Sequence, residues 1–348
     1  MELNEEQLAE FVQELGIEII NPDRRYWLIR AGKEGAFFNE FLRLGFTGIG
    51  YAINDLEFLK TATKEQLKDK IATILTDSEN QIGQIASKIY NFVHEVKKDD
   101  VIIMPSAGRE IISFGIIEDS DIYISDQLLL EESIIAANSQ IIPDKRRKVK
   151  WIKTTKSENV PAKVLLHLFS PHGISLIADK EIIELVDNLI SDLFLKNSEA
   201  HMTFNVKTEE NIDFDSLTDY LTILNNATRF SANYFKENTK PTVKLNLNSP
   251  GPISLEASIY TVIGTVIFLA LLGCDFEISA LGCKFKVKSE GLYKYIKLCL
   301  EHIKEKGKEE RGYNRNLSKL QIKEPEVIKK IREDIEKKEE SSDSPIDS

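Results

Sequence analysis

The stretch ASIYTVIGTVIFLALLGC, residues 257–274, contains no charged residue, although 29% of the whole chain is charged. An apolar segment of this kind has to be removed from water, either in a protein core or in a bilayer. Its length is at the lower edge of what spans a membrane, which takes about 20 apolar residues. Ser258, Thr261 and Thr265 recur on one helical face, and predicted strands flank the segment. We therefore expect a buried core helix, with a membrane helix as the alternative.

The overall composition favours two domains and argues against one kind of partner. A chain of 348 residues with 42% hydrophobic content can form more than one large core. Its formal net charge is -11. A protein that grips phosphate backbones without regard to sequence needs a basic surface, so the acidity speaks against that class while leaving room for a local basic patch.

The cysteines and the N-terminus indicate a cytoplasmic protein. Cys274, Cys283 and Cys299 are too few for a disulfide framework and lack the CxxC spacing of a zinc site. The first residues, MELNEEQLAEFVQELG, are acidic and do not resemble a secretion signal. We expect no metal site and no cofactor.

Periodicity and composition divide the chain into four parts and predict an α+β fold. Residues 1–20 form an N-terminal part with an amphipathic helix over residues 1–16, and 21–155 form a first domain of short strands and helices. The polar stretch TTKSENVP marks a boundary, after which residues 162–306 form a second α+β domain. Residues 307–348 are charged throughout, and we expect them to be a flexible tail.

The first domain carries four motifs in a fixed order: YWLIRAGKEG, GFTGIGYAINDLEFL, VKKDDVIIMPSAGREIISFGII and RRKVKWI. Short strands with variable connections predict a small barrel or a strongly curved sheet. This order resembles the PUA-like superfamily, in particular EVE-type domains related to YTH domains, in the version found N-terminal to bacterial restriction and phage-defence effectors. The resemblance covers residues 22–155.

The resemblance implies a β-barrel whose open side holds a nucleobase flipped out of its strand. Where the family usually has Gly-Trp, this chain has Gly50-Tyr51, which offers a smaller stacking face. Carried over motif by motif, the candidate base- or ligand-binding residues are Tyr26, Trp27, Arg30, Gly32, Lys33, Tyr51, Asn54 and Asp55.

Elementary chemistry is consistent with such a pocket. Extruding a base costs a few kcal/mol, which stacking and edge hydrogen bonds have to offset. Aromatic stacking contributes about 1–3 kcal/mol per base and needs no basic surface. Basic side chains beside the motifs are candidates for contacts with the flanking phosphates: Arg24, Arg25, Lys145, Arg146 and Arg147.

Several of these residues have a structural alternative. Tyr26 and Trp27 alternate along a strand, so at least one of them should point into a core. Asp55 is placed to cap the turn before Leu56 to Leu59. The default interpretation of the basic run 145–150 is the solvated face of a strand, with phosphate contact as the alternative.

No catalytic motif accompanies these residues. The sequence contains no GxxxxGK[ST] phosphate loop, no GxSxG and no HExxH, so we expect a protein without enzymatic activity. Our leading hypothesis is a sensor of modified or flipped bases in anti-phage defence, binding DNA rather than RNA. Its C-terminal domain would form homo-oligomers or recruit an effector protein. The alternatives are a receptor for a free nucleotide or nucleotide messenger, and an effector that acts on membranes through residues 257–274.

Overall fold

In the computed structural model the chain is an α+β protein, as the sequence predicts. Contacts divide it into two compact units. We call Asp23–Ile190 the half-barrel unit, and Met1–Pro22 together with Ser191–Ser348 the sheet–helix unit. The structure describes residues 12–13, 16–51, 53–75, 79–127, 141–170, 172–207, 212–237, 240–245, 251–273, 290–306 and 312–340.

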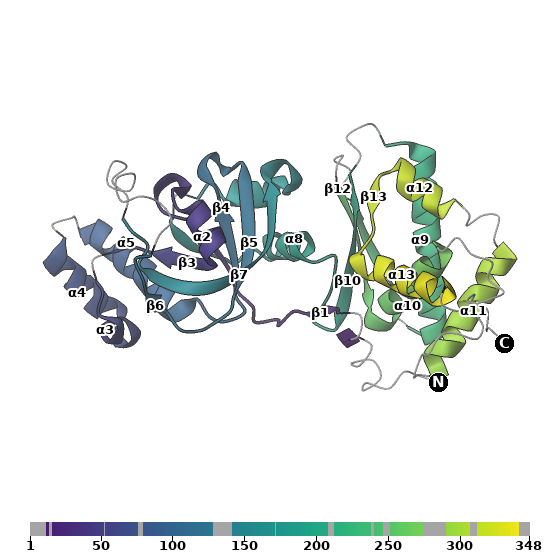
Figure 1. Cartoon of the computed structure of the whole chain (residues 1–348), viewed down its shortest axis with the longest axis horizontal. Helices are drawn as coiled ribbons and strands as arrows, with labels where there is room; N and C mark the ends of the chain where they lie inside the picture. Colours follow the sequence, from purple (N-terminus) through teal and green to yellow (C-terminus); the bar gives the residue numbers. More distant parts are fainter. Residues whose placement is uncertain are drawn as a thin grey trace, which may run out of the picture. The chain divides into compact units, whose positions relative to one another are not determined.

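The half-barrel unit is built on a seven-stranded sheet in the order β3-β7-β5-β4-β2-β8, with β6 beside β7 (Figure 1). All neighbours are antiparallel except β2 and β4, which run parallel. The strands are β2 Tyr26–Ile29, β3 Phe46–Ile49, β4 Val101–Pro105, β5 Ile111–Ile117, β6 Tyr123–Ile124, β7 Lys145–Lys156 and β8 Ile174–Ile177.

The long strand β7 makes this sheet curl. Its first residues pair with β3 and β6, and from Val149 onward it pairs with β5. The β5–β7 register shifts between Phe114 and Gly115, an irregularity that bends a strand and increases its twist. A Cβ atom on Gly115 would lie 2.7 Å from Cε3 of Trp151, so the indole needs a glycine at this bend.

Helices cover both faces of this sheet. One buried cluster contains Trp27, Ile29 and residues of α3 to α5, and a second contains Tyr26, Leu28 and residues of α7 and α8. The helices are α2 Phe38–Leu44, α3 Leu56–Thr61, α4 Lys64–Ile74, α5 Glu79–Tyr90, its π-helical continuation η2 Asn91–Glu95, α7 Ala162–His167 and α8 Lys180–Ile190, with short 3-10 turns η1 Lys33–Gly35, η3 Ala107–Arg109 and η4 Ser157–Asn159.

The sheet–helix unit has a sheet in the order β1-β9-β10-β12-β11, with β13 beside β10, and its helices lie on one face of that sheet (Figure 1). Only β1 and β9 are parallel among these pairs of described strands. The elements are β1 Glu18–Ile19, β9 Leu193–Lys196, β10 Glu199–Val206, α9 Phe214–Phe235, β11 Thr242–Leu245, β12 Gly251–Ser258, α10 Ile259–Leu272, α11 Glu290–Lys306, α12 Tyr313–Lys319, β13 Ile322–Lys323 and α13 Glu326–Glu340.

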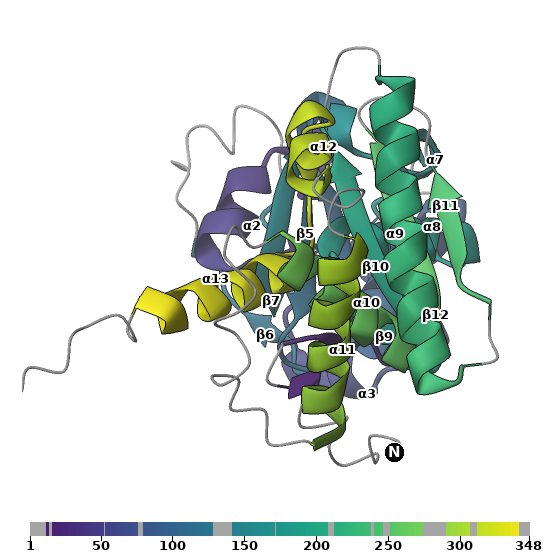
Figure 2. The same cartoon turned by 90° about the vertical axis from the view of Figure 1, so that its right-hand side faces the viewer.

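The uncharged segment forms the central helix α10 of this unit, which packs between α9, α11 and α13 (Figure 2). Its 14 residues span about 21 Å, less than the roughly 30 Å of a bilayer core. Thr261 and Thr265 are buried, as their helical spacing suggested. In the described part of the chain, no helix combines the length and the apolar character needed to cross a membrane.

Small and hydroxylated residues let α10 approach its neighbours closely. The Tyr295 hydroxyl of α11 lies 2.9 Å from the Gly264 carbonyl and 2.8 Å from the Ser231 Oγ of α9. A Cβ atom on Gly264 would lie 2.8 Å from Cβ of Ser231 and 2.9 Å from Cε2 of Phe235. The glycine therefore sets the distance between α9 and α10.

The domain boundaries differ from the expected ones at three places. Residues 162–190 belong to the half-barrel unit, because β8 pairs with β2 and α8 packs on its sheet. Residues 16–22 join the sheet–helix unit, because β1 pairs with β9. The predicted helix in residues 1–16 lies outside the described residues except for positions 12, 13 and 16.

The third difference concerns the predicted tail. Residues 313–340 form α12, β13 and α13 of the sheet–helix unit rather than a flexible segment. Val327, Ile328 and Ile335 recur at helical spacing and are buried in its core. High overall charge hid this apolar stripe, because the charged side chains occupy the other positions of the helix.

Two helical glycines give a matched test of this packing. We expect Gly264→Ala to lower the free energy of unfolding of the sheet–helix unit by about 1–2 kcal/mol, because overpacking outweighs the gain in helix propensity. Gly83→Ala in α5 should instead raise the stability of the half-barrel unit by about 0.5–1 kcal/mol, because a Cβ there would meet no atom within 4 Å.

Urea unfolding measures both effects. Tryptophan fluorescence reports the half-barrel unit, because Trp27 and Trp151 both lie there, and circular dichroism reports both units. An unchanged or raised stability of Gly264→Ala would contradict the close packing of α9 and α10.

Candidate functional site

The aromatic pair of β2 lies in two cores. Tyr26 is fully buried, and its hydroxyl donates a hydrogen bond to Asp187 of α8. Burial, followed by the charge of Asp187, raises the pKa of this tyrosine, while nearby Arg24 lowers it. Trp27 is buried on the opposite face, where its Nε1 donates to Oδ2 of Asp100 at 2.9 Å. Since helices cover both faces of the sheet, neither ring is free to stack on a base, which corrects the predicted site for both residues.

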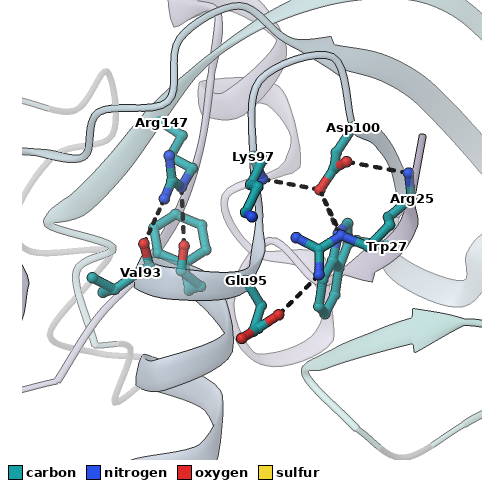
Figure 3. A network of polar contacts seen from close by, with 8 residues as sticks. Arg25, Trp27, Val93, Glu95, Lys97, Asp100 and Arg147 are labelled. Atoms are coloured by element: carbon teal, nitrogen blue, oxygen red, sulfur yellow. Dashed lines mark hydrogen bonds and ion pairs between the residues drawn. The ribbon is translucent and has the colours of Figure 1, made fainter. Parts of the chain in front are cut away.

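A buried carboxylate, Asp100, organises the beginning of β2 and β4 (Figure 3). Its oxygens accept hydrogen bonds from the backbone N–H of Arg25 at 3.2 Å, from that of Lys97 at 2.9 Å and from the Trp27 indole. The Arg25 guanidinium pairs with Glu95 at 2.9 Å and lies 3.7 Å from Asp100. Arg25 is thus held in a structural network rather than presented to a phosphate.

The predicted phosphate contacts from β7 are buried as well. Arg147 is 1% exposed, and its Nε and Nη2 donate to the carbonyls of Phe92 and Val93 at 2.9 and 2.8 Å, with a further bond to Ser120. These carbonyls lie in the last turn of the helix formed by α5 and η2, where carbonyls lack intrahelical partners. Burial lowers the pKa of Arg147 to about 10, so the side chain is protonated at neutral pH and satisfies the helix end.

Lys145 and Arg146 hold neighbouring loops in place. Lys145 is fully buried, and its Nζ donates to the Tyr51 carbonyl at 2.5 Å, to Asn54 Oδ1 at 3.1 Å and to Asp144 at 2.6 Å. Burial lowers the pKa of Lys145, an effect that Asp144 opposes. Arg146 is 2% exposed and lies over the ring of Phe46, 4.1 Å from its centroid. The prediction that Lys145, Arg146 and Arg147 bind phosphate therefore does not agree with their positions.

The second predicted motif is partly structural. Tyr51 is half-buried against the core that contains Trp27, and burial raises its pKa. Asn54 is exposed and bonded to Lys145. Asp55 caps α3 by accepting the Phe58 N–H at 3.0 Å, which confirms the capping alternative.

Three turns of the half-barrel unit come together beside Arg30, and we call them the turn cluster: residues 30–36 after β2, 106–110 between β4 and β5, and 168–170 with 172 after α7. A Cβ atom on Gly35 would lie 2.7 Å from the backbone nitrogen of Ala107, so only glycine permits this approach.

Backbone strain also marks the turn cluster. Glu34 and Arg109 have φ angles of 55° and 62°, which place them in the left-handed region. That conformation costs a non-glycine residue about 1–2 kcal/mol. Strained residues of this kind concentrate at functional sites, so the observation directs attention to these turns.

Two arginines share one acceptor within the turn cluster. Arg30 donates through Nη2 to the Leu168 carbonyl at 2.8 Å, and Arg109 donates through Nε to the same oxygen at 3.3 Å. Arg30 also bonds the carbonyls of Ser170 at 2.7 Å and His172 at 3.3 Å. Burial and the charge of Arg109 lower the pKa of Arg30, the effect expected of two cations held side by side.

These bonds leave several donors unused. Among the described residues, neither Nη1 of Arg30 nor the two Nη groups of Arg109 have a hydrogen-bond partner. Lys33 is exposed on the same turn as Gly32, whereas exposed Glu34 and Glu110 partly offset the positive charge. Fixed guanidinium groups with free N–H donors suit a carboxylate or phosphate, which they can bind with two parallel hydrogen bonds. The arrangement is therefore an anion-binding candidate.

Of the predicted ligand residues, the turn cluster contains Arg30, Gly32 and Lys33. The sequence did not reveal Arg109 or residues 168–170 and 172 as parts of the site, because the pattern at 104–108 indicated a simple turn between two strands. The one available signal was a basic residue directly after Gly108, and no spacing connects it to position 30.

In comparison with known proteins, one family model matches a part of the half-barrel unit. Residues 27–165 match the family model DUF8426, a domain of unknown function. The match contains both Arg30 and Arg109. No curated protein and no solved structure matches the chain.

The Asp100 network can be tested with two adjacent aspartates. Asp100→Asn should lower the free energy of unfolding of the half-barrel unit by about 1–3 kcal/mol, because an amide cannot accept from all of these buried donors. Asp99→Asn is the control: this residue is exposed with a φ of 69°, which asparagine tolerates well. Urea unfolding followed by tryptophan fluorescence reports both variants, and equal stability of the two would show that Asp100 is not an anchor.

Proposed function

We propose that the half-barrel unit is a non-catalytic binding module for nucleic acid, with the turn cluster as its phosphate-binding site. The observation that carries this proposal is the arginine pair. Arg30 and Arg109 share the Leu168 carbonyl, and both guanidinium groups keep N–H donors that have no partner among the described residues.

The pair is ordered before a ligand arrives. Four hydrogen bonds to three backbone carbonyls fix the two side chains. Binding therefore costs little further side-chain entropy, which otherwise amounts to about 0.5–1.5 kcal/mol per immobilised side chain. Hydrogen bonds to a charged group contribute about 1.5–3 kcal/mol each, so a single phosphate can be held by a few contacts.

The binding mode is local rather than an extended basic track. The buried positions of Lys145, Arg146 and Arg147 remove the longest basic run from the surface, and the chain as a whole is acidic. A local site supports recognition of one nucleotide unit within a strand. The resemblance to PUA-like modules of phage-defence proteins supports a modified or flipped base, in DNA rather than RNA, as the feature that is read. In this proposal the sheet–helix unit serves oligomerisation or recruitment of an effector, in the cytoplasm.

The burial of Lys145, Arg146 and Arg147 also favours a second candidate function. This candidate is a receptor for a free nucleotide or nucleotide messenger. A small ligand needs the arginine pair alone and no contacts along a strand. The two candidates differ in the dependence of affinity on salt, because only a strand releases condensed counterions when it binds.

Exchange of one arginine tests the proposal. Arg109→Ala should weaken binding of a short single-stranded DNA by roughly 10- to 100-fold, as expected for loss of a charge-assisted hydrogen bond. It should also reduce the slope of log affinity against log salt by about 0.7, the value for one phosphate contact on a single strand. Fluorescence anisotropy measures both quantities, with plain and modified bases and with free nucleotides as competitors.

Lys148→Ala is the matched control, because it removes an exposed positive charge from β7 without touching the turn cluster. A larger effect of Lys148→Ala than of Arg109→Ala would move the phosphate site to β7. Binding of free nucleotides alone would favour the receptor.

A further inference from the structure

An exposed aromatic ring lies directly against the arginine pair. Phe169 is 59% exposed, and the Arg109 guanidinium lies over its ring, 4.3 Å from the centroid. Single exposed apolar residues are common on protein surfaces, so exposure alone carries no meaning. What distinguishes Phe169 is its contact with a residue of the candidate phosphate site.

Other aromatic residues of the half-barrel unit are less available. Trp27 is buried, and the half-buried Trp151 donates its Nε1 to the Phe41 carbonyl at 2.8 Å. Tyr51 is half-buried against the core. Among the described Phe, Tyr and Trp residues of this unit, Phe169 is the one whose side chain is largely exposed.

The backbone that carries this ring is held by the same turn that binds the arginines. The Phe169 N–H donates to the Leu166 carbonyl at 3.1 Å, in the turn that ends α7. The preceding residue, Leu168, provides the carbonyl that accepts from both Arg30 and Arg109. The backbone of Phe169 is therefore held beside the arginine pair, and the Arg109 guanidinium lies over its ring.

We infer that Phe169 is the stacking residue for a nucleobase whose neighbouring phosphate is bound by Arg30 and Arg109. This inference rests on the function proposed above. Arg109 contacts the ring on one side, and the exposed remainder of the ring is available to a base. Stacking on an aromatic ring tolerates every base, because each has a π-face.

The ligand class follows from this geometry. A base inside a duplex is already stacked on its neighbours and presents only its edges in the grooves. An exposed ring beside a phosphate site therefore selects single-stranded DNA, or a strand with an unstacked base, over an intact duplex. Phe169 then determines preference for unstacked bases, while the arginines bind any phosphate.

The test uses the full-length protein and two short single-stranded DNAs of equal length, one with bases that include 2-aminopurine and one abasic throughout. Phe169→Ala should weaken binding of the base-containing strand by about 5- to 150-fold and leave the abasic strand unaffected within about twofold. The change in 2-aminopurine fluorescence on binding should disappear in Phe169→Ala and be retained in Phe169→Trp. Phe214→Ala, which removes a 77% exposed ring from the sheet–helix unit, is the matched control.

The outcomes distinguish a failure of the stacking role of Phe169 from a failure of the proposed nucleic-acid-binding function. Equal losses on both strands would overturn the stacking role and show that Phe169 acts by positioning Arg109. If the wild-type protein binds both strands and Phe169→Ala weakens neither, the stacking role is also overturned, while the phosphate site stands. A wild-type protein that binds neither strand would contradict the proposed function itself.

Discussion

The buried carboxylate of Asp100 fixes the half-barrel unit at the point where two parallel strands begin. It binds the backbone of Arg25, the indole of Trp27 and the turn at Lys97, which sets the register of Tyr26 opposite Val101. That register determines where β2 and β4 end, and their ends carry the two turns that meet at Gly35. The turn cluster, and the arginine pair within it, therefore depend on a carboxylate at the opposite end of the strands.

The basic residues of this unit serve two different purposes. Those at the start of β7 point inward and satisfy carbonyls that loops and a helix end leave without partners, as Arg147 does for Phe92 and Val93. Arg30 and Arg109 also bind carbonyls, but only with part of their donors. Both arrangements place guanidinium groups against backbone oxygens, and the difference is whether N–H groups remain unused. An acidic protein can in this way keep a small positive site without an extended basic surface.

Local patterns predicted the parts of the structure that depend on local interactions. The helix in residues 257–274 follows from its uncharged composition, and the cap at Asp55 from its side chain and position. Pairing across long sequence separations left no such signal: nothing in the sequence connects Glu18 with Phe194. The charges of Lys145 to Arg147 indicated a surface strand, because burial of a cation becomes favourable only when carbonyls from distant segments meet it. The same non-local convergence concealed Arg109 and Phe169.

Nuclear magnetic resonance of the arginine side chains would show which guanidinium groups meet a ligand. In a titration of the isotope-labelled protein with a short single-stranded DNA, the Nε–H and Nη–H signals of Arg30 and Arg109 should shift with increasing ligand. The signals of Arg146 and Arg147 should stay in place, because these side chains are buried in the fold. Shifts at Arg146 and Arg147 with none at Arg30 and Arg109 would contradict the assignment of the turn cluster as the binding site.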